Sequence, residues 1–129
     1  MELYEAAHMS VPEADRQMFV AGAHGTPCRH LSMRNSTFEG NNIEGVFSLT
    51  HVTFNSRPVY LHTPLNLFLY FFTDSSLSVW VVGPKLGARA GVMYAYDVGI
   101  DPASLSGSWS CLNRNTWIVD PDVSFVCLS

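Results

Sequence analysis

Charged side chains are scarce in this chain. Asp, Glu, Lys and Arg make up 14% of its 129 residues, with Lys85 as the single lysine, whereas about 25% is usual. The net charge is −4 and the basic residues form no run. The electrostatic pattern of a nucleic-acid or anionic-lipid partner is therefore missing. With so few charges, the surface is either rich in Ser, Thr and Asn or covered by a partner.

Long hydrophobic runs and targeting signals are also missing. The most apolar window, 65–72, is far short of the roughly 20 residues that a membrane-spanning helix needs. Residues 1–5 show neither the basic nor the apolar region of a signal peptide. The sequence thus predicts no transmembrane segment.

Cysteines are few and odd in number. Cys28, Cys111 and Cys127 fit a reducing intracellular compartment better than a secreted disulfide scaffold. Cys111 and Cys127 could pair if their strands are neighbours, which would leave Cys28 free. The sequence leaves this pairing open.

What the chain does contain is a strong β-sheet signal. Between 55 and 83, polar turns separate three short runs of β-branched and aromatic residues. Similar runs recur at spacings of about ten residues, the rhythm of an antiparallel sheet. The predicted fold is mainly β: a small antiparallel sandwich, meander or barrel of seven to eight strands. The first predicted strand spans 45–50, and residues 51–54 either extend it or enter the following turn. The other predicted strands span 57–62, 66–72, 77–83, 91–97, 108–111, 116–119 and 123–128.

Residues 1–42 have a different texture. Ser10 can cap a helix whose first turn holds Pro12 and Glu13, and glycines follow Val20. Residues 26–42 look like a loop. The predicted organisation is an N-terminal helix and loop over 1–42, packed on an antiparallel β domain over 43–129, with 101–105 as a short helical turn or loop.

A set of short motifs in this domain points to a family. In order, they are Glu44-Gly45-Val46-Phe47, Asn55-Ser56-Arg57-Pro58-Val59-Tyr60, a Leu- and Tyr-rich strand over 67–72, Trp80-Val81-Val82-Gly83, Leu86-Gly87, Gly91-Val92-Met93-Tyr94, Asp97, Pro102, Gly107-Ser108-Trp109 and Trp117. Residues 42–126 thereby resemble a poorly characterised β-rich module that recurs in large proteins of algae, other protists and some marine animals. The resemblance implies a small antiparallel module for binding or display, without catalytic residues. Ser56 stands where the family has Gly, which makes a tight turn with positive φ less favourable there.

Two groups of residues could carry metal or acid–base chemistry. His24, Cys28 and His30 offer zinc ligands, but their spacing matches no standard zinc motif, and an ordinary polar loop is the preferred interpretation. The acidic residues Asp97, Asp101, Asp120 and Asp122 lie near turns. There, carboxylates more often accept hydrogen bonds from backbone N–H groups. The sequence predicts no metal site, no cofactor and no catalytic residue.

Aromatic residues supply the candidate ligand-binding set. Such rings line glycan and peptide grooves, although in a small β domain they more often form the core. Along 79–82 both faces of the strand are apolar, so something must cover the second face. The candidate binding residues are Tyr60, Tyr70, Trp80, Tyr94, Trp109 and Trp117.

Three functional hypotheses follow. The first is a non-catalytic protein-interaction or assembly module, such as a peripheral subunit of a larger complex, with a protein partner or a homo-oligomer. The second is a small-ligand or glycan binder that uses an aromatic groove. The third is a small enzyme, which would need a deep pocket that holds two of His51, His62, Asp97 and Asp101.

Overall fold

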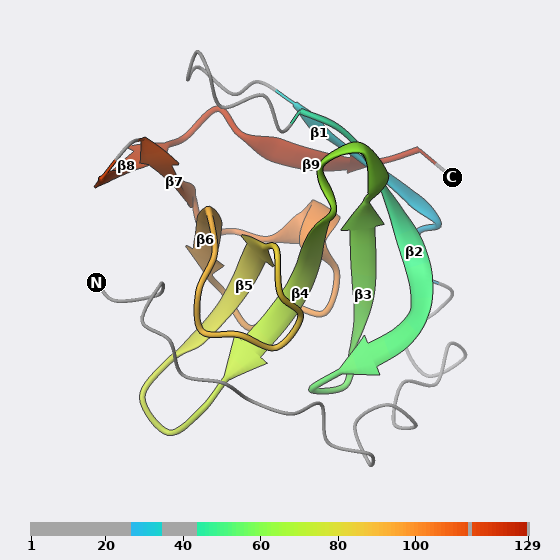
Figure 1. The fold of residues 1–129 in the computed structure, drawn as a ribbon, viewed down its shortest axis with the longest axis horizontal. Helices are drawn as coiled ribbons and strands as arrows, with labels where there is room; N and C mark the ends of the chain where they lie inside the picture. The colour runs from blue at the N-terminus through green and yellow to red at the C-terminus, as the bar shows by residue number, and fades with distance from the viewer. Residues whose placement is uncertain (1–26, 35–43, 114, 129) are drawn as a thin grey trace.

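The computed structural model describes residues 27–34, 44–113 and 115–128. It contains nine strands and two 3₁₀ turns (Figure 1). The predicted N-terminal helix lies outside the described residues. The elements are β1 His30–Arg34, β2 Gly45–Phe54, β3 Arg57–His62, η1 Thr63–Leu65, β4 Leu67–Thr73, β5 Ser78–Gly83, β6 Met93–Tyr96, η2 Pro102–Ser104, β7 Trp109–Asn113, β8 Thr116–Asp120 and β9 Ser124–Cys127.

All nine strands form one antiparallel sheet in the order β8-β7-β6-β5-β4-β3-β2-β1-β9. Strands β1 to β8 follow one another as a meander, and β9 returns to pair with β1. The sheet curls into a half-barrel (Figure 1). The mainly β prediction is confirmed. The architecture is a curled meander with nine strands where seven to eight were expected.

The additional strand is β1, which lies in a segment predicted as loop. Only Leu31 and Met33 are buried there, between exposed or polar neighbours. Two apolar side chains are too weak a periodic signal to identify a strand. The strand forms because β2 and β9 pair with it on both sides, which is information that local sequence does not carry.

The turn between β2 and β3 is tight although it contains no glycine. Asn55 and Ser56 both have positive φ, 52° and 63°, as a two-residue hairpin turn of the primed type requires. Ser56 thus adopts the conformation that the resemblance associated with Gly. The side chain of Asn55 donates to the carbonyl of Phe71 at 3.0 Å, which holds the turn against β4.

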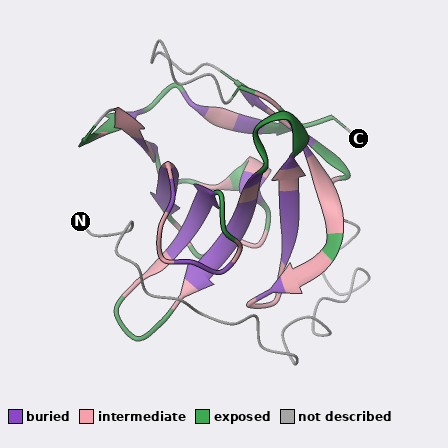
Figure 2. Cartoon of the chain, in the orientation of Figure 1, coloured by how far each residue is buried: buried purple, intermediate pink, exposed green. Residues whose placement is uncertain are grey.

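Side chains on the two faces of the sheet form two separate apolar clusters. The inner cluster fills the concave side of the half-barrel and draws on every strand except β8. The outer cluster lies on the convex side, chiefly over β3 to β6. Figure 2 shows that the strands in the middle of the sheet consist mostly of buried residues. Alternation along each strand explains the division: in β5, Trp80 and Val82 face inward while Val79 and Val81 face outward.

The chain covers part of this outer face with its own β5–β6 connection. The Tyr70 hydroxyl, on β4, donates to the carbonyl of Ala88 at 2.5 Å. Leu86 packs against the outer cluster. A Cβ on Gly91 would lie 2.6 Å from a Val81 methyl carbon, so this close crossing requires glycine. Figure 1 shows the connection in front of β4 and β5.

The β6–β7 connection spans the open side of the half-barrel. It carries η2, which packs beside β9. Two side chains from the sheet hold it: Trp80 Nε1 donates to the Gly99 carbonyl at 2.9 Å, and the Arg57 guanidinium donates to the carbonyls of Val98 (2.6 Å) and Gly99 (3.3 Å). Arg57 also lies over the Phe71 ring, 4.2 Å from its centroid, a cation–π arrangement.

A disulfide joins Cys28 to Cys127, and Cys111 is the buried free thiol. The alternative in which Cys111 and Cys127 pair is therefore wrong. Cys111 lies on β7, far along the sheet from β9, whereas β1 pairs directly with β9. Because β1 was not recognised, the proximity of Cys28 to Cys127 could not be seen in the sequence. With two of the three cysteines joined, the odd count no longer argues for a reducing compartment.

Candidate functional site

Three of the four acidic residues considered for catalysis or metal binding, Asp97, Asp101 and Asp120, accept hydrogen bonds from the backbone. Asp97 accepts four hydrogen bonds: Oδ1 from the Gly99 N–H, and Oδ2 from the Ser106 N–H, the Ser106 hydroxyl and the Gly107 N–H. Burial raises the pKa of Asp97, but these hydrogen bonds together lower it below its ordinary value. Asp101 and Asp120 each accept one backbone N–H two residues later. In the described ranges, no three His, Cys, Asp or Glu side chains are grouped to hold a metal.

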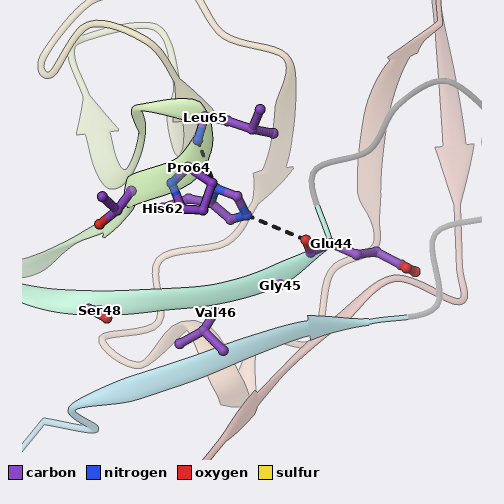
Figure 3. A pocket seen from close by; sticks show the side chains of 8 residues that line it. Glu44, Gly45, Val46, Ser48, His62, Pro64 and Leu65 are labelled. Atoms are coloured by element: carbon purple, nitrogen blue, oxygen red, sulfur yellow. Dashed lines mark hydrogen bonds between the residues drawn. The ribbon is translucent and has the colours of Figure 1, made fainter.

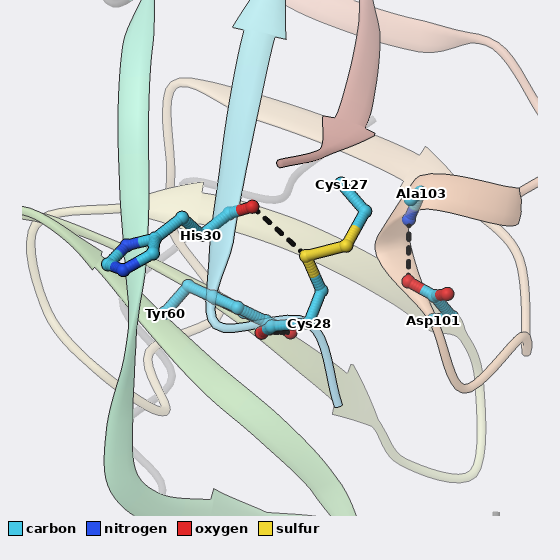
Figure 4. The surroundings of a disulfide bond; sticks show 6 residues. All are labelled: Cys28, His30, Tyr60, Asp101, Ala103 and Cys127. Carbon is cyan, nitrogen blue, oxygen red and sulfur yellow. Dashed lines mark hydrogen bonds between the residues drawn. A yellow bond between two sulfur atoms is a disulfide. The ribbon is translucent and has the colours of Figure 1, made fainter. Parts of the chain in front are cut away.

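The three residues weighed as zinc ligands, for which an ordinary polar loop was preferred, do not offer a zinc site as a set: His24 lies outside the described residues, and Cys28 is oxidised. Cys28 is half of the disulfide and has no thiolate to offer. Its Sγ lies 3.0 Å from the carbonyl oxygen of His30 (Figure 4), a contact and not a hydrogen bond, since a disulfide sulfur carries no proton. The Tyr60 hydroxyl donates to the Cys28 carbonyl at 2.7 Å. Burial, and then the charge of Asp101, raise the pKa of Tyr60, which stays a donor.

His62 is one of the residues that line an open depression of about 480 Å³ (Figure 3). The His62 ring is buried, and its nitrogens are both engaged. Nδ1 accepts from the Leu65 N–H at 3.3 Å, and Nε2 lies 3.4 Å from the carbonyl oxygen of Glu44. These partners require the tautomer with hydrogen on Nε2, so neither nitrogen is a free base. Val46, Ser48 and Pro64 line the same depression.

Gly45 makes room for this histidine. It has φ +141°, and a Cβ there would lie 2.9 Å from His62 Nε2. The Phe47 ring packs edge-on against the imidazole at 5.0 Å. His62 is thus a fitted core residue at the rim of the depression. None of His51, Asp97 and Asp101 lines that depression, so it does not meet the requirement set for an enzyme.

The structure divides the six candidate aromatic residues between the two faces of the sheet. Tyr60, Trp80 and Trp109 belong to the inner cluster. Tyr70 and Tyr94 belong to the outer cluster, and Trp117 packs against it. All except Trp117 are buried. The six therefore do not line one common surface, and for most of them packing accounts for their position.

Three aromatic residues, however, form a continuous row on the outer face. Tyr94 contacts Tyr96 edge-on, with ring centroids 5.3 Å apart, and contacts Trp117 at 4.7 Å. The row crosses β7 at Ser110, the register partner of Tyr94, whose small side chain lets the rings meet. Tyr96 is 51% exposed. We call Tyr94, Tyr96 and Trp117 the aromatic row.

The row ends at β8, one of the two edge strands of the sheet. Within the part of the chain that the structure describes, β8 pairs with one strand, β7. Ile118 is 37% exposed and Val119 is 60% exposed. Figure 2 shows this edge as largely exposed and intermediate surface. Val119 is the register partner of Ser110 and lies on the outer face beside the row, whereas Ile118 pairs with Cys111 and lies on the inner side.

The other edge strand differs. β9 has β1 on one side, and η2 packs against it. Its last residue, Cys127, is tied to Cys28. Exposed apolar side chains also occur near it, at Val126 and Leu128. β8 is therefore the more accessible edge.

Motif residues that carry the family resemblance meet at the β6–β7 connection. Arg57 and Trp80 donate to its carbonyls, and Asp97 accepts its N–H groups. A Cβ on Gly107 would lie 2.7 Å from the Tyr96 carbonyl oxygen. These residues build and close the half-barrel.

Sequence reasoning missed Ile118 and Val119 as candidate binding residues. They lie in predicted strands, but exposure depends on where a strand falls in the sheet. Local sequence could not reveal this edge, because in a simple meander the last strand, 123–128, would end the sheet; β8 ends it only because β9 returns to pair with β1.

No known protein family, curated protein or solved structure matches the chain. Among the described residues, no helix has the length and apolar character to cross a membrane. The functional argument therefore depends on the geometry of the chain itself.

Proposed function

We propose that this chain is a non-catalytic protein-interaction module whose β8 edge pairs with a strand of a partner chain. The observation that supports the proposal most directly is the position of β8 at the end of the sheet with Ile118 and Val119 exposed on its two faces. Strand addition to such an edge supplies main-chain hydrogen bonds, and the alternating side chains supply specificity.

The composition of β8 supports this role. Natural edge strands are usually protected from pairing by lysine, proline, a bulge or an inward-pointing charge. The sequence Thr116-Trp117-Ile118-Val119 contains no charged residue and no proline, and the register with β7 runs without a shift from Trp109↔Asp120 to Asn113↔Thr116. The one charged side chain of β8, Asp120, is 2% exposed. The edge is regular and apolar, which suits a pairing surface.

The experiment compares two lysine substitutions. Val119→Lys places a charge on the pairing edge, while Val98→Lys, the matched control, changes a valine that is 65% exposed and lies in a connection. A random decapeptide library is selected on the purified wild-type chain, and the affinities of the enriched peptides are measured on all three proteins. We expect the selection to enrich extended peptides rich in β-branched residues. These peptides should bind wild type and Val98→Lys with similar affinity, and should bind Val119→Lys at least tenfold more weakly. Peptides that bind all three equally would exclude β8 as the site.

A second function is favoured by the aromatic row. Rings on an exposed strand face can stack on the apolar face of a sugar or another flat ligand, and Tyr96 is half exposed. Titration of a glycan panel, read by tryptophan fluorescence, tests this role. If Tyr96→Ala abolishes glycan binding and Val119→Lys leaves it unchanged, the result would support a ligand-binding aromatic row rather than a strand-pairing edge.

A further inference from the structure

We propose that the strand that pairs with β8 is β8 of a second copy of this chain, antiparallel and related by a two-fold axis at Ile118. This inference rests on the proposed function, since it names the partner of the same edge. It follows from the register of the last hairpin, the side chains on its two faces and the position of Pro121.

The register determines which backbone groups point away from β7. Asn113 and Thr116 close a two-residue turn as register partners, so they form a hydrogen-bonded pair. Hydrogen-bonded and non-hydrogen-bonded pairs alternate along an antiparallel ladder. The backbone groups of Trp117 and Val119 therefore point outward, toward any strand added to this edge.

Only one two-fold register uses the whole strand. With the axis at Ile118, Trp117 faces Val119 of the second copy, and all of Thr116–Asp120 is paired. Moving the axis to Val119 would place Trp117 opposite Pro121, which has no N–H to donate. Moving it to Trp117 would place Val119 opposite Asn115, which lies in the turn.

In this register each exposed apolar side chain of the edge has an apolar partner. On the outer face, Val119 lies opposite Trp117 of the second copy and extends the aromatic row. On the inner side, the two Ile118 side chains lie opposite each other. Asp120 faces Thr116, so no like charges are opposed. A two-fold interface requires a surface that complements itself, and β8 satisfies this requirement.

The size of the interface sets the expected affinity. Two five-residue strands bury less than the roughly 1,200 Å² of a standard stable complex. The dimer should therefore be weak, with a dissociation constant on the order of 10–100 µM. It forms only at high local concentration of the chain.

Disulfide trapping tests the axis directly. Ile118→Cys and, as a matched control, Val119→Cys are made in a Cys111→Ala background, because Cys111 is the register partner of Ile118 and could trap the new thiol within the chain. Directly opposite Cβ atoms lie about 5 Å apart, within disulfide reach. The two position-119 residues are diagonal neighbours, about 7–8 Å apart or more.

Under mild oxidation at 100 µM protein, we expect Ile118→Cys to form a disulfide-linked dimer at least tenfold faster than Val119→Cys. Sedimentation equilibrium of wild type and Val98→Lys should show a weak dimer that Val119→Lys lacks. Equal trapping of both cysteines, or monomers at every concentration up to 1 mM, would overturn the inference. If selected peptides still bind β8 in that case, the edge remains a pairing surface and only the second copy is wrong; if they do not, both proposals fail.

Discussion

The indole N–H of Trp80 donates to the carbonyl oxygen of Gly99 at 2.9 Å, across 19 positions of sequence. Arg57 Nε donates to the same oxygen at 3.3 Å. One carbonyl thus ties β5 and β3 to the connection that spans the open side of the half-barrel. Because this connection also contacts β9 through η2, the shared carbonyl ties the middle of the sheet to a segment that reaches its β9 end.

The shared carbonyl leads to a prediction of non-additivity. Trp80→Phe removes one donor and ring volume, and should cost about 2–3 kcal/mol. Arg57→Met removes the other donor and should cost about 1–2 kcal/mol. In either single variant the Gly99 oxygen keeps a partner, whereas in the double variant it has neither of these donors. We expect the double variant to be at least about 0.5 kcal/mol less stable than the sum, measured by urea unfolding. Strict additivity would contradict the shared bond.

Asp97 predicts how stability depends on pH. Burial opposes ionisation, but the hydrogen bonds from Gly99, Ser106 and Gly107 lower its pKa below the ordinary 3.8. The folded state therefore binds its proton less readily than the unfolded state. The stabilisation is fully present above pH 4 to 5 and is lost as the pH falls through the lowered value.

Asp97→Asn tests this dependence. The amide replaces one acceptor oxygen with an NH₂ group facing backbone donors, so we expect a loss of about 2–3 kcal/mol at pH 7. The loss should shrink at pH 3, where the wild-type carboxyl also begins to protonate. Asp122→Asn, on an exposed residue, is the control and should change little at either pH. If Asp97→Asn lowered the free energy of unfolding equally at pH 3 and pH 7, the negative charge of Asp97 would not be what stabilises the β6–β7 connection.

The turn at Asn55 and Ser56 predicts a stabilising substitution. Ser56 has φ 63°, a conformation that costs an L-residue about 1 kcal/mol or more and costs glycine almost nothing. Ser56→Gly should therefore raise the free energy of unfolding by about 0.5–1 kcal/mol. Asn55→Gly should gain less, because Asn tolerates this region and its side chain bonds to the Phe71 carbonyl. Destabilisation by Ser56→Gly would contradict this turn geometry.

The three cysteines should respond differently to thiol reagents. Burial, and then the negative charge of Asp120, raise the pKa of Cys111 to about 12. Its thiol should therefore stay protonated and react slowly in the native protein at pH 8. We expect one reactive thiol per chain after denaturation without reductant and three after reduction. A count of three without reductant would contradict the Cys28–Cys127 bond.

Removing the Cys28–Cys127 disulfide should strongly lower the free energy of unfolding. Cys28 and Cys127 are 99 positions apart, and closing a loop of this length stabilises by roughly 4–5 kcal/mol in the chain-entropy model. Cys28→Ser, Cys127→Ser and the double variant should show the same loss in urea unfolding, because each removes the same cross-link. Cys111→Ala instead removes one buried sulfur and should cost about 1 kcal/mol.

Local sequence was sufficient for the strands that carry their own signal. Runs such as 57–62 and 67–72 are dense in β-branched and aromatic residues and match β3 and β4 closely. Turn residues were equally informative: the proposed role of Asp side chains as backbone acceptors holds for Asp97 and Asp101. These features depend on neighbours within a few positions, which the sequence displays.

Tertiary structure alone decided what depends on strands meeting across the sheet. Strand β1 exists because β2 and β9 flank it, and the disulfide partner of Cys127 follows from that pairing. The same holds for exposure. Trp80 and Val119 both lie in apolar strands, yet one is fully buried and the other 60% exposed, because β5 is central and β8 ends the sheet. Sequence determines which side chains alternate across a strand, but the order of strands determines which of them meet solvent or a partner.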